Sequence, residues 1–270
     1  MCWRGLIRIS SDATQLMQLN YKHHKGPGDP LIILHGLYGN QGNWAPQARQ
    51  LAQDFNVYAL DARNHGQSPW ADTMTLAEMA NDVAQTMAEL GLQSAHLIGH
   101  SMGGKTAMKL ALTNAAMVQS VTVVDIAPVA YPDAGDGIIN ALQGIALATL
   151  DSRGEADSLL STAVGEKSVR DFLLTNLQRG DEGNWRWRFN LPVLSSSFRE
   201  VTSWPSGLGS YAGPALFIKG ERSDYILPEH QSALQRHFPN AQFKIVNGAG
   251  HWVHSEKPEA VLRLIRNFLL

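Results

Sequence analysis

Short, nearly continuous apolar runs recur along this chain, and most are followed by a stretch whose apolar residues have helical spacing. Such runs are typical of parallel strands that are buried on both faces of a sheet. The predicted strands are Leu31–Leu34, Val57–Leu60, His96–Ile98, Val121–Val124, Leu216–Ile218 and Phe243–Val246. The predicted helices are Trp44–Gln53, Leu76–Leu90, Met102–Ala115, Pro228–His237 and Pro258–Leu270. This order predicts an α/β protein with a doubly wound, mostly parallel sheet.

The alternation stops between residues 128 and 213, where helical patterns follow one another without a strand signal. The helical spacing is clearest at Ile138–Leu150 and Ser168–Leu177. A segment of this length is too long for a plain loop in a compact domain. We therefore expect residues 128–213 to form a helical cap, inserted into a core domain made of residues 1–127 and 214–270.

The composition and charge favour a protein that acts on small molecules. The 270 residues are 44% hydrophobic and carry a formal net charge of -2, so neither nucleic acid nor an anionic membrane is an expected partner. The N-terminal segment lacks the pattern of a signal peptide, and no apolar run reaches the roughly 18 residues of a membrane-spanning helix. Cys2 is the single cysteine, which excludes an intramolecular disulfide and favours a cytoplasmic location.

A serine flanked by glycines follows the predicted strand that ends at Ile98. The pattern Gly99-His-Ser101-Met-Gly103 is typical of the sharp strand-to-helix turn that exposes a nucleophilic serine in hydrolases. Glycine is favoured at both flanking positions because the backbone turns sharply there and larger side chains would clash. Ser101 is therefore the candidate nucleophile.

The same residues also match a second motif. From Gly99 to Thr106 the chain fits G-x-x-x-x-G-K-[ST], the P-loop that binds nucleotide phosphates. The apolar run that ends at Asp125 resembles the strand that holds the nucleotide's magnesium ion in such proteins. The local sequence therefore leaves a serine hydrolase and a nucleotide-binding protein both open.

Two distant segments favour the hydrolase. The tetrahedral intermediate of acyl transfer needs two backbone donors, and His35-Gly36-Leu37 follows an earlier strand, where the second donor belongs. We expect the oxyanion hole to consist of the N–H groups of Leu37 and Met102. His251 lies in a glycine-rich turn after the last strand, where an imidazole can serve as the general base that activates serine.

Two carboxylates compete for the role of the acid that orients His251. Asp125 follows the predicted strand Val121–Val124, and Asp224 follows the predicted strand Leu216–Ile218. Either strand end can hold the acid in a fold of this kind. The residues themselves therefore leave both candidates open.

Five segments together resemble one known family. They are His35–Gly39, Asp61–Ser68, Gly99–Lys105, Asp125–Val129 and Gly250–Pro258. Through these segments, the chain from about Leu31 to its end resembles the YbfF-type bacterial esterases and the related ABHD11 hydrolases. Proteins of this family have the α/β-hydrolase fold. The resemblance implies that Asp125 is the acid, while Ser223 is an auxiliary hydrogen-bonding group beside the alternative Asp224.

We therefore expect a serine esterase that hydrolyses small or acyl-chain carboxylic esters or thioesters through an acyl-serine, with Ser101, His251 and Asp125 as catalytic residues. Trp252 and Tyr38 are expected to line the substrate pocket. No histidine spacing indicates a metal site, and the expected chemistry needs no cofactor. Thioesterase, carbon–carbon hydrolase and perhydrolase activities use the same triad and stay open, as does a non-catalytic receptor of this fold.

Overall fold

A seven-stranded sheet organises the part of the chain that the computed structural model describes, residues 17–132, 137–180 and 183–270. Cys2 lies outside these residues. The strands are β1 (Tyr21–His24), β2 (Pro30–Leu34), β3 (Asn56–Leu60), β4 (Ala95–His100), β5 (Val118–Val124), β8 (Ala215–Gly220) and β9 (Ala241–Val246). Their order is β1-β3-β2-β4-β5-β8-β9, and only β1 runs antiparallel to its neighbour. The predicted doubly wound, mostly parallel sheet is confirmed.

Helices cover both faces of this sheet. One face carries α2 (Leu76–Glu89), α3 (Met102–Thr113) and α9 (Gln231–His237). The other carries α1 (Ala45–Leu51) and α11 (Pro258–Leu269). Local sequence fixes where α2 begins, because the Thr75 hydroxyl accepts the N–H of Glu78 while the Glu78 carboxylate accepts the N–H of Thr75.

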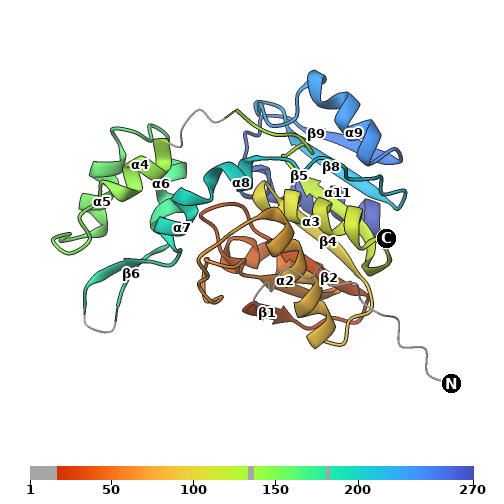
Figure 1. Cartoon of the computed structure of the whole chain (residues 1–270), viewed down its shortest axis with the longest axis horizontal. Helices are drawn as coiled ribbons and strands as arrows, with labels where there is room; N and C mark the ends of the chain where they lie inside the picture. The colour runs from red at the N-terminus through yellow and green to blue at the C-terminus, as the bar shows by residue number, and fades with distance from the viewer. Residues whose placement is uncertain (1–16, 133–136, 181–182) are drawn as a thin grey trace.

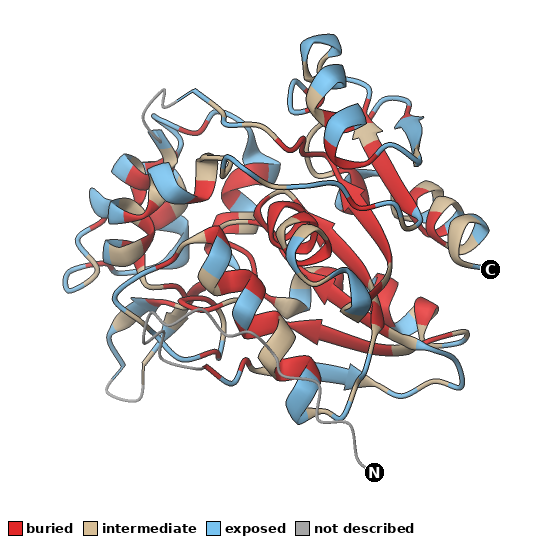
Figure 2. Ribbon diagram, turned by 45° about the vertical axis from the view of Figure 1, so that its right-hand side comes forward, coloured by how far each residue is buried: buried red, intermediate tan, exposed pale blue. Residues whose placement is uncertain are grey.

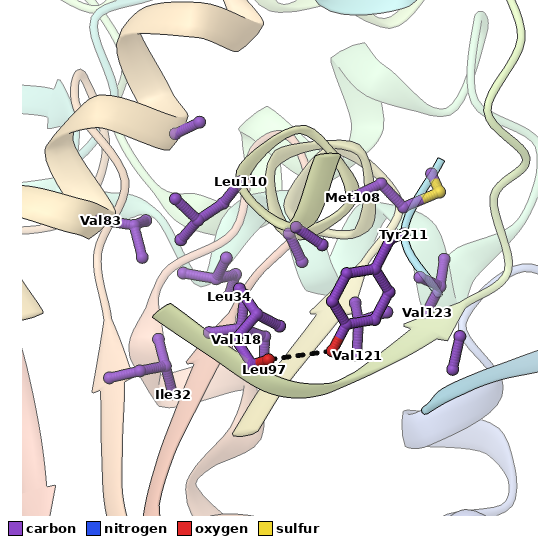
Figure 3. Close-up of a cluster of buried hydrophobic side chains, with 14 of the residues drawn as sticks. Ile32, Leu34, Val83, Leu97, Met108, Leu110, Val118, Val121, Val123 and Tyr211 are labelled. Carbon is purple, nitrogen blue, oxygen red and sulfur yellow. Dashed lines mark hydrogen bonds between the residues drawn. The ribbon is translucent and has the colours of Figure 1, made fainter. Parts of the chain in front are cut away.

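The central strands are buried along nearly their whole length (Figure 2). Figure 3 shows the cluster on the α3 side, where side chains of β2, β4 and β5 meet those of α2 and α3. Tyr211 enters this cluster and donates its hydroxyl hydrogen to the Val118 carbonyl at 3.0 Å, so its polar atom is satisfied inside the core. The apolar runs of the sequence thus form the rigid platform that supports the strand ends.

The chain between residues 137 and 202 leaves the sheet and forms a separate layer of short elements. They are α4 (Gly137–Gln143), α5 (Arg153–Leu160), α6 (Lys167–Leu174), β6 (Leu177–Arg179), β7 (Trp185–Trp187), α7 (Leu191–Ser196) and α8 (Phe198–Thr202). In Figure 1, α4, α5, α6 and β6 gather at one end of the molecule, beside the sheet. A buried apolar cluster joins them to Tyr38, Met79 and Met102 of the sheet domain.

The structure corrects three local expectations and adds a strand that was not predicted. β6 and β7 form an antiparallel hairpin inside the segment that was expected to be helical throughout, and the predicted helix Ser168–Leu177 ends early because Leu177 belongs to β6. The predicted helix Ile138–Leu150 is limited to α4, and Gly144 follows its last residue, where glycine weakens helix propagation. β1 was missed because its sequence, Tyr-Lys-His-His, is polar and mostly exposed.

None of the helices within the described ranges has the length and apolar character needed to cross a lipid bilayer.

Candidate active site

The carboxyl ends of the parallel strands bring three predicted site residues and the start of the predicted oxyanion loop to one edge of the sheet. His35 directly follows β2, Ser101 directly follows β4 and Asp125 directly follows β5. His251 lies on the turn after β9. Ligands of open α/β sheets bind at this edge, so the fold alone converts distant sequence positions into one cluster.

Ser101 occupies a strained turn between β4 and α3. Its φ of 51° and ψ of -119° lie outside the usual regions for a residue with a Cβ atom. In the described residues, the non-glycine positions with positive φ are Tyr38, Asn64, Ser101 and Asp125, three of which are predicted site residues. Strain of this kind costs about 1–3 kcal/mol per residue and is concentrated at functional sites.

Close backbone packing explains the glycines on both sides of Ser101. A Cβ atom at Gly99 would lie 2.2 Å from the Gly103 carbonyl oxygen, and one at Gly103 would lie 2.5 Å from the Leu34 carbonyl oxygen. Neither position has room for a side chain. The turn is thereby pressed against the end of β2, where the His35 loop begins.

His251 is hydrogen-bonded to the carboxylate of Asp125. The distance from His251 Nδ1 to Asp125 Oδ2 is 2.8 Å, and Asp125 is completely buried. The Gly220 N–H donates to Asp125 Oδ1 at 2.9 Å, and the Ser223 hydroxyl donates to Oδ2. The buried charge is therefore compensated by three donors, as a buried carboxylate requires.

The structure places the two candidate acids differently. Asp224 is exposed, and no interaction found in the described residues joins it to His251. Its neighbour Ser223 is buried and points to Asp125. The geometry required of the orienting acid is met by Asp125, and Ser223 has the auxiliary position that the family resemblance implies.

The two predicted oxyanion donors lie on segments that touch each other. A Cβ at Gly36 would lie 3.3 Å from Ser101 Cβ and 2.8 Å from His100 Nδ1, so the loop that carries Leu37 lies against the serine turn. Met102 is the first residue of α3, where helix N–H groups lack intrahelical partners. Both positions suit donors to an oxyanion, and their role stays a prediction.

Two buried histidines hold the loop around Leu37. His35 Nδ1–H donates to the Gly36 carbonyl at 2.7 Å, and its Nε2 accepts the Ala62 N–H at 2.9 Å. His65 Nε2 accepts the Tyr38 N–H at 3.3 Å. Burial lowers the pKa of His35 and lowers that of His65 to about 3, the latter helped by the neighbouring His35. Both rings are therefore neutral acceptors at pH 7.

A third histidine ties the serine turn to the base. His100 Nε2–H donates to the His251 carbonyl at 2.9 Å, and the two rings lie 4.7 Å apart. Burial, followed by the nearby His254 and His251, lowers the pKa of His100 well below its usual value. His100 thus fixes the backbone of His251 without adding charge to the site.

Lys105, the lysine of the alternative P-loop motif, is buried and bound within the protein. Its ammonium donates to the carbonyls of Thr202 and Ser203 at 2.6 and 2.8 Å, and lies 4.9 Å from the centre of the Tyr131 ring. Burial lowers the pKa of Lys105 to about 7. Its donors serve the end of α8, whereas a P-loop lysine reaches phosphate groups.

Both predicted pocket residues contact the outer layer, and Trp252 also contacts the base. The Trp252 ring is 5.4 Å from the His251 ring and 5.9 Å from Phe172 of α6. Tyr38 is buried, and its ring packs edge-on against Phe189 at 5.7 Å. Each side chain has an ordinary packing partner, and their role in lining a substrate pocket stays a prediction.

A cavity of about 440 Å³ lies beside Phe189 in the outer layer. Its lining side chains are Trp70, Leu142, Gln143, Ile145, Leu147, Arg186, Trp187, Phe189, Leu191 and Pro192. The volume falls within the range of small-molecule sites, and such sites are mainly apolar with few polar groups. The cavity is suited to an apolar chain.

Sequence reasoning missed three groups that organise the site. His65 and His100 lie within recognised motifs but have no individual signal for their hydrogen bonds. Asn176, which follows α6, is completely buried and donates to the Tyr38 carbonyl at 2.7 Å. No pattern in the sequence indicates that an asparagine in the outer layer holds the loop after β2.

Comparisons with known proteins agree with the fold. The family model described as alpha/beta hydrolase fold matches residues 29–258. The sn-1-specific diacylglycerol lipase ABHD11 of Xenopus tropicalis is 41% identical to this chain, covering 99% of the chain and 87% of that protein. Esterase YbfF of Escherichia coli is 36% identical, covering 89% of the chain and 92% of that protein.

A solved structure shows the same similarity in three dimensions. The structure of a marine microorganism esterase is 37% identical, with a TM-score of 0.91 over 94% of this chain and 100% of that one. The resemblance inferred from the sequence motifs is thus confirmed.

Proposed function

Because this chain belongs to the α/β hydrolase fold family, we propose that Ser101, His251 and Asp125 are the catalytic triad of a carboxylic ester hydrolase. Relatives that cover most of the chain are named as esterases and lipases, and this chain is likewise a carboxylic ester hydrolase. The observation that carries the residue assignment is the 2.8 Å hydrogen bond from His251 to the buried Asp125.

The triad residues have distinct tasks in this reaction. Ser101 Oγ attacks the ester carbonyl while His251 Nε2 removes its proton, and the same proton then passes to the departing alcohol. Asp125 holds His251 in the tautomer that carries the proton on Nδ1 and stabilises the imidazolium. Water activated by His251 afterwards releases the acid from the acyl-serine, and no step requires a cofactor.

The N–H groups of Leu37 and Met102 stabilise the oxyanion. Charge develops on the carbonyl oxygen only in the tetrahedral intermediate, so donors already fixed at that position lower the barrier. Support for this assignment comes from the contact between the Gly36 segment and Ser101. His35, His65 and Asn176 hold the loop through hydrogen bonds to its neighbours.

We propose that residues 128–213 form a cap and that residues 1–127 and 214–270 form the core domain; residues 1–16, 133–136 and 181–182 of these ranges lie outside the described part of the chain. The cavity of about 440 Å³ in the cap is the proposed site for the acyl chain of the ester. Tyr38 packs against Phe189, which lines this cavity, and Trp252 packs against His251 of the triad. Residue Cys2, as the single cysteine of the sequence, supports the prediction of a cytoplasmic location.

The nucleophile assignment is tested with a fluorophosphonate probe and p-nitrophenyl acetate. We expect the probe to label Ser101, and Ser101→Ala to abolish both labelling and hydrolysis above background. Ser196→Ala is a matched control because Ser196 is an exposed serine of α7 and should keep full activity. Hydrolysis that persists in Ser101→Ala would show that another residue is the nucleophile.

A further inference from the structure

An aromatic ring outside the triad lies flat on the base. The Tyr225 and His251 rings are stacked, with 3.9 Å between their centres and 22° between their planes. Tyr225 follows β8 and comes two residues after Ser223, and its side chain is 38% exposed. The contact therefore covers one face of the imidazole, whereas Asp125 meets its Nδ1 edge.

The backbone of Tyr225 is fixed from two sides. Its N–H donates to the Ser223 hydroxyl oxygen at 3.3 Å, and its carbonyl accepts the Tyr131 hydroxyl. The Tyr131 hydroxyl oxygen also accepts the N–H of Ala127 at 2.8 Å. Burial raises the pKa of Tyr131, so this hydroxyl stays protonated and remains a donor.

Tyr131 is in turn held where the cap joins the core. Its N–H donates to the Thr202 carbonyl at 3.0 Å, and the same carbonyl accepts from the Lys105 ammonium at 2.6 Å. Lys105 also lies over the Tyr131 ring. Lys105 lies on α3, four residues after Ser101. Its contacts with Tyr131 and with the Thr202 carbonyl therefore tie α3 to both ends of the cap. Through Tyr131, α3 also helps to fix the position of Tyr225.

The titratable groups around His251 determine which of its neighbours can stabilise a positive charge on its ring. The titratable side chains that contact its ring or interact with its charge include Asp125, His100, His254 and Tyr225. Burial lowers the pKa of His254 to about 3 and that of His100 well below its usual value. Both are therefore neutral at pH 7, which leaves Asp125 at one edge of the His251 ring and the Tyr225 ring over its face.

We propose that Tyr225 is a positioning residue for His251, whose ring holds the imidazole against Asp125 and stabilises the imidazolium formed while Ser101 is acylated. This inference rests on the proposed triad. As the bond between Ser101 Oγ and the carbonyl carbon forms, the serine proton moves to His251 Nε2, and the ring carries the charge until that proton passes to the leaving alcohol. A cation over an aromatic face is stabilised by the negative potential of that face.

The test compares Tyr225→Leu with Tyr225→Phe, because phenylalanine keeps the ring face and leucine removes it. We expect Tyr225→Leu to lower the plateau kcat/KM for p-nitrophenyl acetate about 2- to 30-fold. It should also move the acid limb of the pH profile to lower pH by about 0.4–1.5 units, because an imidazolium without this contact loses its proton more readily. Tyr225→Phe should retain most of the activity and leave the acid limb in place.

The rate of fluorophosphonate labelling of Ser101, measured across the same pH range, reports activation by His251 without binding of the ester. In Tyr225→Leu, the acid limb of the labelling rate should shift in parallel with that of kcat/KM. An acid limb that is unmoved in Tyr225→Leu, or equal losses in the two variants, would overturn the inference even if activity fell. Failure of the triad assignment looks different, because the unmodified protein would then not be labelled at Ser101. Tyr131→Phe, which releases the Tyr225 carbonyl, should shift the limb in the same direction by a smaller amount.

Discussion

Lowering the pH from 8 to 5 should reduce the free energy of unfolding, and two fully buried histidines that stay unprotonated in the folded protein should account for about 4 kcal/mol of this loss. Burial lowers the pKa of both His65 and His254 to about 3, from the ordinary value of 6.5. Nearby His35 adds to the effect on His65, and His251 adds to the effect on His254.

The sign follows from proton binding in the two states. Between pH 6.5 and pH 3 the unfolded chain binds a proton at each of these rings and the folded protein does not. Stability is therefore lost as the pH falls through this window. A pH of 5 lies about 1.5 units below the pKa of a histidine in the unfolded chain. The loss of stability at this pH is therefore about 2 kcal/mol for each ring. The total is a large fraction of the 5–15 kcal/mol typical of a folded domain.

The variant His254→Phe isolates one of the two contributions. The His254 ring is stacked on Trp44 at 4.3 Å with 6° between the planes, and its Nδ1 has no hydrogen-bond partner among the described atoms. Phenylalanine keeps the stacked ring and cannot bind a proton. We expect this variant to lose about 2 kcal/mol less stability between pH 8 and pH 5 than the unmodified protein loses.

Urea denaturation followed by tryptophan fluorescence at the two pH values measures this change. His23→Phe is the matched control, because the His23 ring is exposed and also stacked, on Tyr58 at 4.4 Å. It should leave the pH dependence as in the unmodified protein. If His254→Phe and His23→Phe show the same loss of stability between pH 8 and pH 5, the reasoning from buried neutral histidines is refuted.

Three further predictions concern activity. Asp125→Asn should lower kcat by several orders of magnitude, because the charge that orients His251 and fixes its tautomer is lost. Asp224→Asn should change kcat by no more than about twofold. Steady-state kinetics of the two variants show which aspartate orients His251. Gly36→Ala should lower kcat about 10²- to 10³-fold by displacing the oxyanion loop, and circular dichroism checks that the variant is folded. Leu147→Trp narrows the cap cavity and should lower the octanoyl-to-acetyl ratio of kcat/KM roughly tenfold, while Leu159→Trp, at a site 50% exposed, should leave the ratio unchanged.

Much of the fold was predictable because its signals are local. A buried parallel strand must be apolar on both faces, and each crossover helix must show an apolar stripe. The elements that escaped prediction lack such patterns. β1 is polar and mostly exposed, and the hairpin of β6 and β7 consists of three-residue strands whose pairing is recognised only in three dimensions.

The candidate nucleophile and the candidate base follow from the sequence by itself. Glycines flank Ser101 because a Cβ atom at Gly99 or Gly103 would lie only 2.2–2.5 Å from a backbone oxygen. This steric requirement is visible in the sequence as a glycine on each side of the serine. His251 was identifiable because a histidine in a glycine-rich turn after the last strand suits the base of such a serine. These features depend on residue type and spacing along the chain.

Only the tertiary structure shows the contacts of the candidate acid, Asp125, and of the residues around it. β5 and β8 are paired neighbours, so Asp125 and Asp224 arrive at the same sheet edge, and only side-chain direction separates the buried hydrogen-bonded carboxylate from the exposed one. Lys105 fits a P-loop as sequence, yet its partners are carbonyls at residues 202 and 203. The stacking of Tyr225 on His251 likewise joins two loops through space. Side-chain direction and long-range packing depend on the whole folded chain, and no local pattern encodes them.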